Sequence, residues 1–191
     1  MPRNPNKPRI PKIWDKYSVS GVPLKDTRII SFKTPITSKN MTPEALVKHL
    51  KNSNHNLGLV IDLTDTDKYY DSNDFVALNV VYLKLPCKGM KLPLQETVDY
   101  FNMIVERFIL EHSRDKKLIG VHCFGGVNRT GYMVCRYLID KLKWKPSMAI
   151  HMFQEARGHT IDAEFYRTDL LKRAPSEATP PPENEKKCSV M

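Results

Sequence analysis

The sequence has little of what defines a membrane or an extracellular protein. No apolar run approaches the roughly 20 residues that span a bilayer, and the N-terminus has no apolar segment typical of a signal peptide. Its 191 residues include only 4 cysteines, whose spacing fits neither a metal site nor a disulfide framework. We therefore expect an intracellular protein, nuclear or cytoplasmic, that keeps free thiols and needs no metal or other cofactor.

Acidic residues are also scarce relative to basic ones. The chain has 21 Asp and Glu against 30 Lys and Arg, which gives a net charge of +9. Such an excess favours anionic partners, among them nucleic acid, phosphorylated substrates and acidic membrane surfaces. A solvated basic surface explains the charge equally well. Charge alone therefore narrows the choice of partner without fixing it.

The two ends differ in composition from the middle of the chain. Residues 1–12 are basic and rich in proline, which predicts an extended arm. Residues 175–191 combine prolines with charged residues and predict a disordered tail. The stretch between them, 13–174, has the length of one domain, which we expect to be monomeric.

Apolar patterns in this middle stretch predict alternating strands and helices. Short β-branched runs predict strands at 28–33, 57–62, 80–85 and 118–122. Helical spacing of apolar residues begins at Thr42-Pro43 and near Thr130, and also covers 94–111, 146–156 and 162–173. Strands alternating with helices, followed by a helical C-terminal part, predict an α/β fold with a central mixed sheet flanked by helices.

The segment VHCFGGVNRTG, residues 121–131, lies where the last predicted strand turns into a helix. Backbone N–H groups of such a loop converge on one point and bind an anion well. Gly125 and Gly126 let the chain curl, and Arg129 can grip phosphate oxygens in a bidentate manner. A thiol at Cys123 would ionise below its usual pKa of about 8.5. These features predict a nucleophile in line for phosphoryl transfer, rather than a buried strand-end cysteine beside an ordinary turn.

The same residues carry a family resemblance. His122-Cys123-x-x-Gly126-x-x-Arg129-Thr130 resembles the signature of cysteine-dependent phosphatases of the protein-tyrosine-phosphatase fold, whose phosphate-binding loop joins the last core strand to a helix. NRTGYMVCRYLID, residues 128–140, is similar to the RNA 5′-triphosphatase branch, which comprises the mRNA capping enzymes, the baculovirus RNA phosphatases and the RNA/RNP-complex-interacting phosphatases. It is most similar to the last group. IPKIWDKY, ISFKTP, IDLTDTDKYYD and EARGH agree, so the resemblance covers about residues 10 to 173.

The resemblance implies a role for each matched residue. Cys123 would form a phosphocysteine, Arg129 would bind the phosphoryl group, His122 would orient the thiol, and Thr130 would assist thiolate departure. The cradle for the phosphate would be the backbone of Phe124, Gly125, Gly126, Val127, Asn128 and Arg129. The substrate would be an RNA 5′ end or another phosphorylated molecule, hydrolysed without a metal.

One loop discriminates among phosphorylated substrates. Protein phosphatases of this fold usually carry a general acid on the loop that here reads PCKGMKLP, residues 86–93, and this loop has no acid. An alkoxide or phenoxide leaving group needs protonation, whereas the phosphoanhydride of a 5′-triphosphate hardly does. Lys88 and Lys91 also suit a polyanion. The loop therefore favours a 5′-triphosphatase or diphosphatase over a protein tyrosine or dual-specificity phosphatase.

Several residues keep two interpretations. Asp65, Asp67 or Asp71 could supply the missing acid, although a polar loop with Asx turns is favoured. Arg157 either reaches a second phosphate or marks a helix end capped by Gly158. Lys33 could contact RNA, although solvation is favoured.

Two positions depart from the RNA 5′-triphosphatase branch. Phe124-Gly125 replaces Thr-His in the phosphate loop, and Ala163 stands about where those proteins often have an arginine. These changes leave a phosphate- or RNA-binding module without turnover as a further alternative.

The C-terminal residues CSVM fit a farnesylation signal at Cys188. A single prenyl chain would give reversible membrane association.

Overall fold

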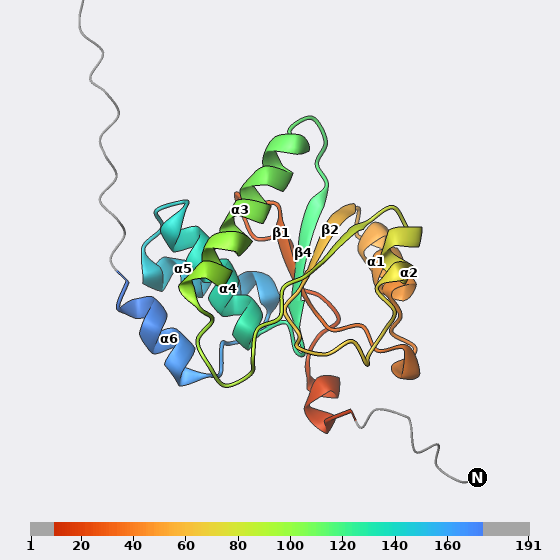
Figure 1. Cartoon of the computed structure of the whole chain (residues 1–191), viewed down its shortest axis with the longest axis horizontal. Coiled ribbons are helices and arrows are strands. Elements are labelled where there is room, and N and C mark those ends of the chain that lie inside the picture. Colours follow the sequence, from red (N-terminus) through yellow and green to blue (C-terminus); the bar gives the residue numbers. More distant parts are fainter. Residues whose placement is uncertain (1–9, 174–191) are drawn as a thin grey trace, which may run out of the picture.

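The computed structural model describes residues 10–173 (Figure 1). The first nine residues of the predicted arm lie outside this range, as do the predicted tail and Cys188. The strands are β1 (Ile29–Lys33), β2 (Leu57–Asp62), β3 (Val81–Lys84) and β4 (Leu118–Cys123). The α-helices are α1 (Pro43–Asn52), α2 (Asn73–Ala77), α3 (Gln95–Glu111), α4 (Asn128–Asp140), α5 (Pro146–Arg157) and α6 (Glu164–Leu171), with 3₁₀ turns at Lys12–Lys16 and Thr37–Lys39. No helix in the described part is long and apolar enough to cross a membrane.

The sheet has the strand order β1-β4-β2-β3, and all neighbouring strands are parallel. The prediction of a mixed sheet is therefore wrong in this respect, while the α/β fold with flanking helices is confirmed. The strands run in one direction because a helix, α1, α2 or α3, connects each strand to the next and returns the chain to the same edge. The last strand, β4, lies in the middle of the sheet.

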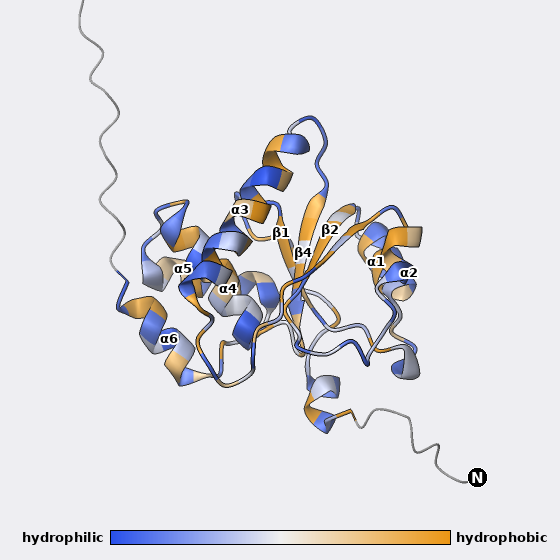
Figure 2. Ribbon diagram, in the orientation of Figure 1, coloured by the Kyte–Doolittle hydropathy of each residue, from blue (hydrophilic) through white to orange (hydrophobic). Residues whose placement is uncertain are grey.

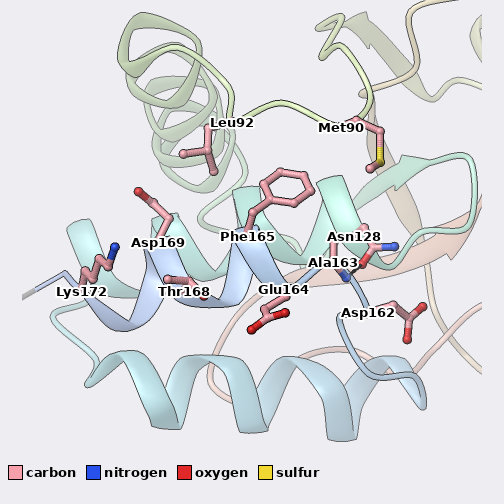
Figure 3. A pocket seen from close by; sticks show the side chains of 10 residues that line it. All are labelled: Met90, Leu92, Asn128, Asp162, Ala163, Glu164, Phe165, Thr168, Asp169 and Lys172. Atoms are coloured by element: carbon pink, nitrogen blue, oxygen red, sulfur yellow. Dashed lines mark hydrogen bonds between the residues drawn. The ribbon is translucent and has the colours of Figure 1, made fainter.

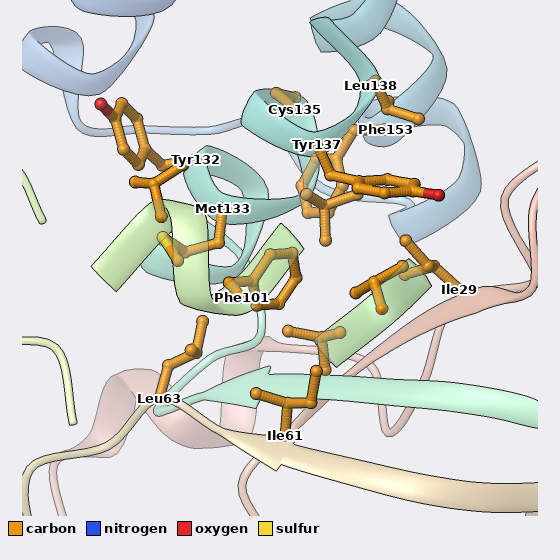
Figure 4. Close-up of a cluster of buried hydrophobic side chains, with 14 of the residues drawn as sticks. Ile29, Ile61, Leu63, Phe101, Tyr132, Met133, Cys135, Tyr137, Leu138 and Phe153 are labelled. Carbon is orange, nitrogen blue, oxygen red and sulfur yellow. The ribbon is translucent and has the colours of Figure 1, made fainter. Parts of the chain in front are cut away.

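Helices cover both faces of the sheet (Figure 1). Helices α3 to α6 lie on one side, and α1 and α2 lie on the other. The strands are the most uniformly hydrophobic elements (Figure 2), because a parallel sheet covered on both faces buries alternate residues on each side. On the α4 side, Ile61 packs in one cluster with Phe101, Met133 and Phe153 (Figure 4). The α1 side has its own cluster, which includes Phe32 and Trp14.

The helix ends follow local sequence signals. Thr42 caps α1, because its side chain accepts a hydrogen bond from Ala45 N (3.0 Å) and Pro43 occupies the first turn. Helix α5 ends at Gly158, which has a left-handed φ of 72°. The predicted Gly158 cap is therefore confirmed. The sequence analysis missed α2, whose five residues are too few to display a helical period.

Lys33 fastens the N-terminal segment to the sheet. Its side chain is buried, with Nζ donating to Trp14 O (3.3 Å) and Tyr17 O (2.9 Å), and it lies 3.6 Å from the Trp14 ring centroid. Burial lowers the pKa of this amine. The expectation of a solvated Lys33 is therefore wrong, because the chain before β1 folds over it. Tyr17 is thereby held at the end of the sheet where β4 finishes.

Candidate active site

The loop after β4 curls beneath the N-terminus of α4. Cys123 ends the strand, Val127 precedes the helix, and Thr34 N donates to Phe124 O (3.1 Å), which ties the loop to the chain after β1. Gly126 has a φ of 65°, and a Cβ there would lie 2.0 Å from Phe32 O. A side chain at this position would therefore both strain the backbone and push the loop off β1.

The Cys123 thiol is buried at the bottom of this loop. Burial alone would raise the pKa of Cys123, but Arg129, the Thr130 hydroxyl and the N–H groups of Thr130 and Val127 outweigh it and lower the pKa. The buried hydroxyl of Thr130 has no hydrogen-bond partner among residues 10–173. The nearby charge and donors favour the thiolate form of Cys123.

Arg129 is fixed at one side of the loop. Its Nη1 donates to Cys87 O (2.8 Å) and Leu63 O (3.2 Å), and Asp65 Oδ1 lies 3.9 Å from the same nitrogen. These contacts engage one end of the guanidinium, and the residue lines the cavity above Cys123. Two carbonyls from separate loops thus hold the side chain in place before any anion arrives.

Arg157 lies behind the loop rather than at its mouth. It is 1% exposed, and its Nε and Nη2 donate to Gly126 O (3.0 Å) and Gly125 O (2.9 Å), while Nη1 and Nη2 donate to Ser18 Oγ (2.5 Å) and Ser18 O (2.9 Å). Burial lowers the pKa of Arg157 to about 10, so the guanidinium remains charged at neutral pH. This arrangement does not fit the interpretation that Arg157 binds a second phosphate, because its guanidinium N–H groups already donate to the loop carbonyls.

His122 contacts the backbone of the loop and a buried polar cluster, not the thiol. Its Nδ1 lies 3.4 Å from Cys123 O, and its Nε2 lies 2.8 Å from the Tyr70 hydroxyl. Burial lowers the pKa of His122. The Tyr70 hydroxyl also lies 2.9 Å from Asp62 Oδ2, which accepts from Lys84 Nζ (3.0 Å) as well. The cluster of His122, Tyr70, Asp62 and Lys84 thus fixes the end of β4 that precedes the phosphate loop.

The Asp62 carboxylate gives this cluster a measurable pH dependence. Its pKa falls from 3.8 to about 2, because the burial that would raise it is outweighed by His122, by hydrogen bonds from Thr64 and by Lys84. A pKa depressed by folding stabilises the folded state above about pH 4, here by roughly 2 kcal/mol, and this contribution disappears as the pH falls toward 2. Urea unfolding of wild type and Asp62→Asn should differ most at pH 6 and converge near pH 2. A pH-independent difference would contradict this assignment.

A cavity of about 190 Å³ opens above Cys123. Its lining comprises Tyr17, Gly89, Met90, Cys123, Phe124, Gly125, Val127, Asn128, Arg129, Ala163, Phe165 and Tyr166. Of the predicted loop residues, only Gly126 faces away from it. The sequence analysis missed Tyr17, whose ring lies so close to Gly125 that a Cβ there would approach it to 2.5 Å. Two neighbouring glycines thus serve two needs, a left-handed turn and a close approach.

The two flanking loops provide no carboxyl group to this lining. In the 86–93 loop, Gly89 and Met90 face the cavity, whereas Lys88 and Lys91 line an adjacent hollow. Of the candidate acids, Asp65 lies 3.9 Å from Arg129 Nη1 without lining the cavity, Asp67 pairs with Lys84 (2.9 Å), and Asp71 accepts from Asn73 N (2.9 Å). The contact of Asp71 is the Asx turn of the favoured interpretation, whereas Asp65 is the candidate acid that contacts the site.

The thiols should differ sharply in reactivity. Burial raises the pKa of Cys87 to about 11 and raises that of Cys135 as well, whereas the pKa of Cys123 is lowered. Iodoacetate at pH 7 should therefore label Cys123 at least about tenfold faster than the other two. Inorganic phosphate should protect it by occupying the loop. Peptide mass spectrometry measures both effects, and equal labelling or absence of protection would show that no anion nest forms.

A buried thiol below convergent N–H groups, with an arginine at its side, defines a cysteine-dependent phosphatase. The chain belongs to the dual specificity phosphatase family, whose catalytic-domain model matches residues 41–173. The enzyme class, the α/β phosphatase fold and the family resemblance predicted from the sequence are thus confirmed.

Individual comparisons agree with this assignment. The chain is 41% identical over 183 residues to the RNA/RNP complex-1-interacting phosphatase homolog of Caenorhabditis elegans, covering 89% of this chain and 78% of that protein. It is 40% identical over 171 residues to the tyrosine-protein phosphatase of Autographa californica nuclear polyhedrosis virus, covering 84% and 98%. Several other curated relatives are longer, and the chain spans about half of their length.

The fold recurs in solved structures of distant sequence. A protein tyrosine phosphatase from Leishmania major superposes with a TM-score of 0.62 at 14% identity, covering 82% of this chain and 97% of that one.

Proposed function

We propose that the protein is a metal-independent RNA 5′-triphosphatase and diphosphatase that acts through a phosphocysteine at Cys123. The observation that carries the proposal is the lining of the cavity, in which no residue has a carboxyl group. A general acid contributes about 10² to 10⁴ in rate where the leaving group must be protonated. A nucleoside polyphosphate is a good leaving group, so its hydrolysis is not slowed by the lack of a general acid.

The reaction follows from the positions of the side chains. The Cys123 thiolate attacks the terminal phosphorus, the N–H groups of the loop and Arg129 hold its equatorial oxygens, and the polyphosphate chain departs through the mouth. Water then attacks the phosphocysteine and releases inorganic phosphate, while Thr130 donates a hydrogen bond to the departing thiolate. His122 contributes by positioning the backbone of Cys123.

We further infer that the partner is RNA and that the protein acts in the nucleus or the cytoplasm. The names of the relatives that mention RNA/RNP complexes and the net charge of +9 support this inference. Membrane association through Cys188 and a monomeric state remain predictions of the sequence.

A direct comparison of substrates tests the proposal. Triphosphate-ended RNA, diphosphate-ended RNA, a phosphotyrosine peptide and a phosphoinositide should be assayed side by side in EDTA. We expect the two RNA ends to give a kcat/KM at least about tenfold above the peptide and the lipid, because only their leaving groups are good without an acid. Turnover restricted to the peptide would identify the protein instead as a protein tyrosine phosphatase. Phosphate-sensitive RNA binding without turnover would identify it as a binding module.

A further inference from the structure

A second hollow, of about 840 Å³, is lined by the residues drawn in Figure 3 and shares part of its lining with the cavity above Cys123. It runs along α6, and four residues line both spaces: Met90, Asn128, Ala163 and Phe165. Asn128 Oδ1 accepts a hydrogen bond from Ala163 N (2.9 Å), which fixes the junction between the two spaces. A group in this groove, as we call the second hollow, can therefore belong to the same molecule as a phosphoryl group above Cys123.

One side of the groove is apolar. The ring of Phe165 projects between the side chains of Leu92 and Met90 (Figure 3). Met90 is 84% exposed and Leu92 is 43% exposed, so the chain leaves both uncovered. An aromatic face beside a thioether and an aliphatic side chain suits a flat ring, which stacks on it whatever its polar pattern.

The other side carries carboxylates. Asp162 and Glu164 line it, and within residues 10–173 neither carboxylate has a hydrogen-bond or ion-pair partner. Asp169 already accepts from the Tyr132 hydroxyl (2.8 Å) and Arg173 Nε (3.0 Å), and Lys172 is the single cation in the lining. Carboxylates repel phosphates and accept hydrogen bonds from ring N–H and amino groups. The groove thus suits an uncharged planar ring with N–H donors and disfavours the phosphates of a nucleic-acid backbone.

We propose that this groove holds the base of the 5′-terminal nucleotide, stacked on Phe165, while the polyphosphate of the same nucleotide occupies the loop above Cys123. The proposal rests on the 5′-triphosphatase function and adds a specificity site to it. Guanine, adenine and cytosine carry amino groups that can donate hydrogen bonds to the carboxylates, whereas uracil has a single ring N–H donor. The site therefore favours amino-bearing bases at the 5′ end.

Turnover of inorganic tripolyphosphate, GTP, ATP and UTP tests this site, because an anhydride is cleaved in all four. Tripolyphosphate against the nucleotides measures the contribution of the whole nucleoside, and the three nucleotides differ only in the base. We expect the kcat/KM for GTP and ATP to exceed that for tripolyphosphate about tenfold or more in the wild type, with UTP between them. Phe165→Ala should bring the ratio of GTP to tripolyphosphate close to one, whereas Phe165→Trp should keep it, because indole also offers a stacking face.

Met148→Ala is the matched control, since Met148 is 51% exposed on α5 and lies outside the groove. It should leave the ratio of GTP to tripolyphosphate unchanged. Equal kcat/KM for GTP and tripolyphosphate in the wild type, or a ratio that Phe165→Ala does not change, would overturn the base site while leaving the triphosphatase intact. Failure to hydrolyse any of the four compounds, with an aryl phosphate still turned over, would instead reject the triphosphatase function itself. A higher kcat/KM for UTP than for GTP would reject the role of the carboxylates.

Discussion

Cys123→Ser should reduce phosphate release by at least about a thousandfold for every substrate, because the hydroxyl is far less ionised than the thiol whose pKa the loop lowers. The fold should survive, since the two side chains differ by one atom and the loop donors remain. Phosphate release with a colorimetric assay, together with the unfolding temperature, separates the two effects.

Cys135→Ala is the control for this substitution. Cys135 is fully buried in α4, and burial raises the pKa of its thiol. Its replacement should cost some stability and leave the turnover per folded molecule unchanged. Residual turnover of Cys123→Ser within tenfold of the wild type would show that the nucleophile lies elsewhere.

Arg157→Ala should unfold the protein more easily and inactivate it at the same time. The substitution leaves the buried carbonyls of Gly125 and Gly126, and the carbonyl of the exposed Ser18, without their donors, at a cost of about 3 kcal/mol or more. For a domain of this size, such a loss lowers the midpoint of thermal unfolding by about 6–12 °C. Turnover should fall as well, because these carbonyls would no longer be held away from the anion.

The combined loss of thermal stability and turnover distinguishes a structural role of Arg157 from binding of the substrate phosphate. A ligand of the substrate would raise KM and leave the unfolding temperature unchanged, whereas the contacts of Arg157 predict a change in both. Arg157→Lys should recover only part of the stability, because one ammonium cannot reach two loops in the geometry of the planar guanidinium. Arg107→Ala is the matched control, since Arg107 is exposed and pairs only with Glu111 on the same helix. It should change neither quantity.

The features that could be predicted from the sequence are those whose signal is local. The thiol, the glycines and Arg129 lie within one short segment, so their spacing alone describes the loop. The four strands were found because β-branched runs remain visible when both faces are buried. The sheet direction was predicted wrongly, because a mixed and a parallel sheet present the same short runs along the chain.

The residues that were missed or misplaced act across long stretches of sequence. Arg157 lies more than thirty positions from the carbonyls it holds, and nothing in the letters ARGH distinguishes a donor to carbonyls from a donor to phosphates. Lys33 was taken for a surface residue, because its burial depends on how Trp14 and Tyr17 fold over β1. A usable signal did exist for Asp62, since an acid that ends a buried strand requires polar neighbours.

The order of the strands has a consequence for folding during synthesis on the ribosome. β1 and β2 do not pair with each other, because each pairs with β4, which is synthesised some sixty residues after β2. Until that strand emerges, the nascent chain holds two apolar segments whose open edges can pair with other chains. The insertion of β4 closes both of these edges. The loop around Cys123 is complete only later, when α5 brings Arg157 behind the carbonyls of Gly125 and Gly126. Protection of the two edges thus precedes catalytic competence, and phosphate should bind only to chains in which α5 has packed.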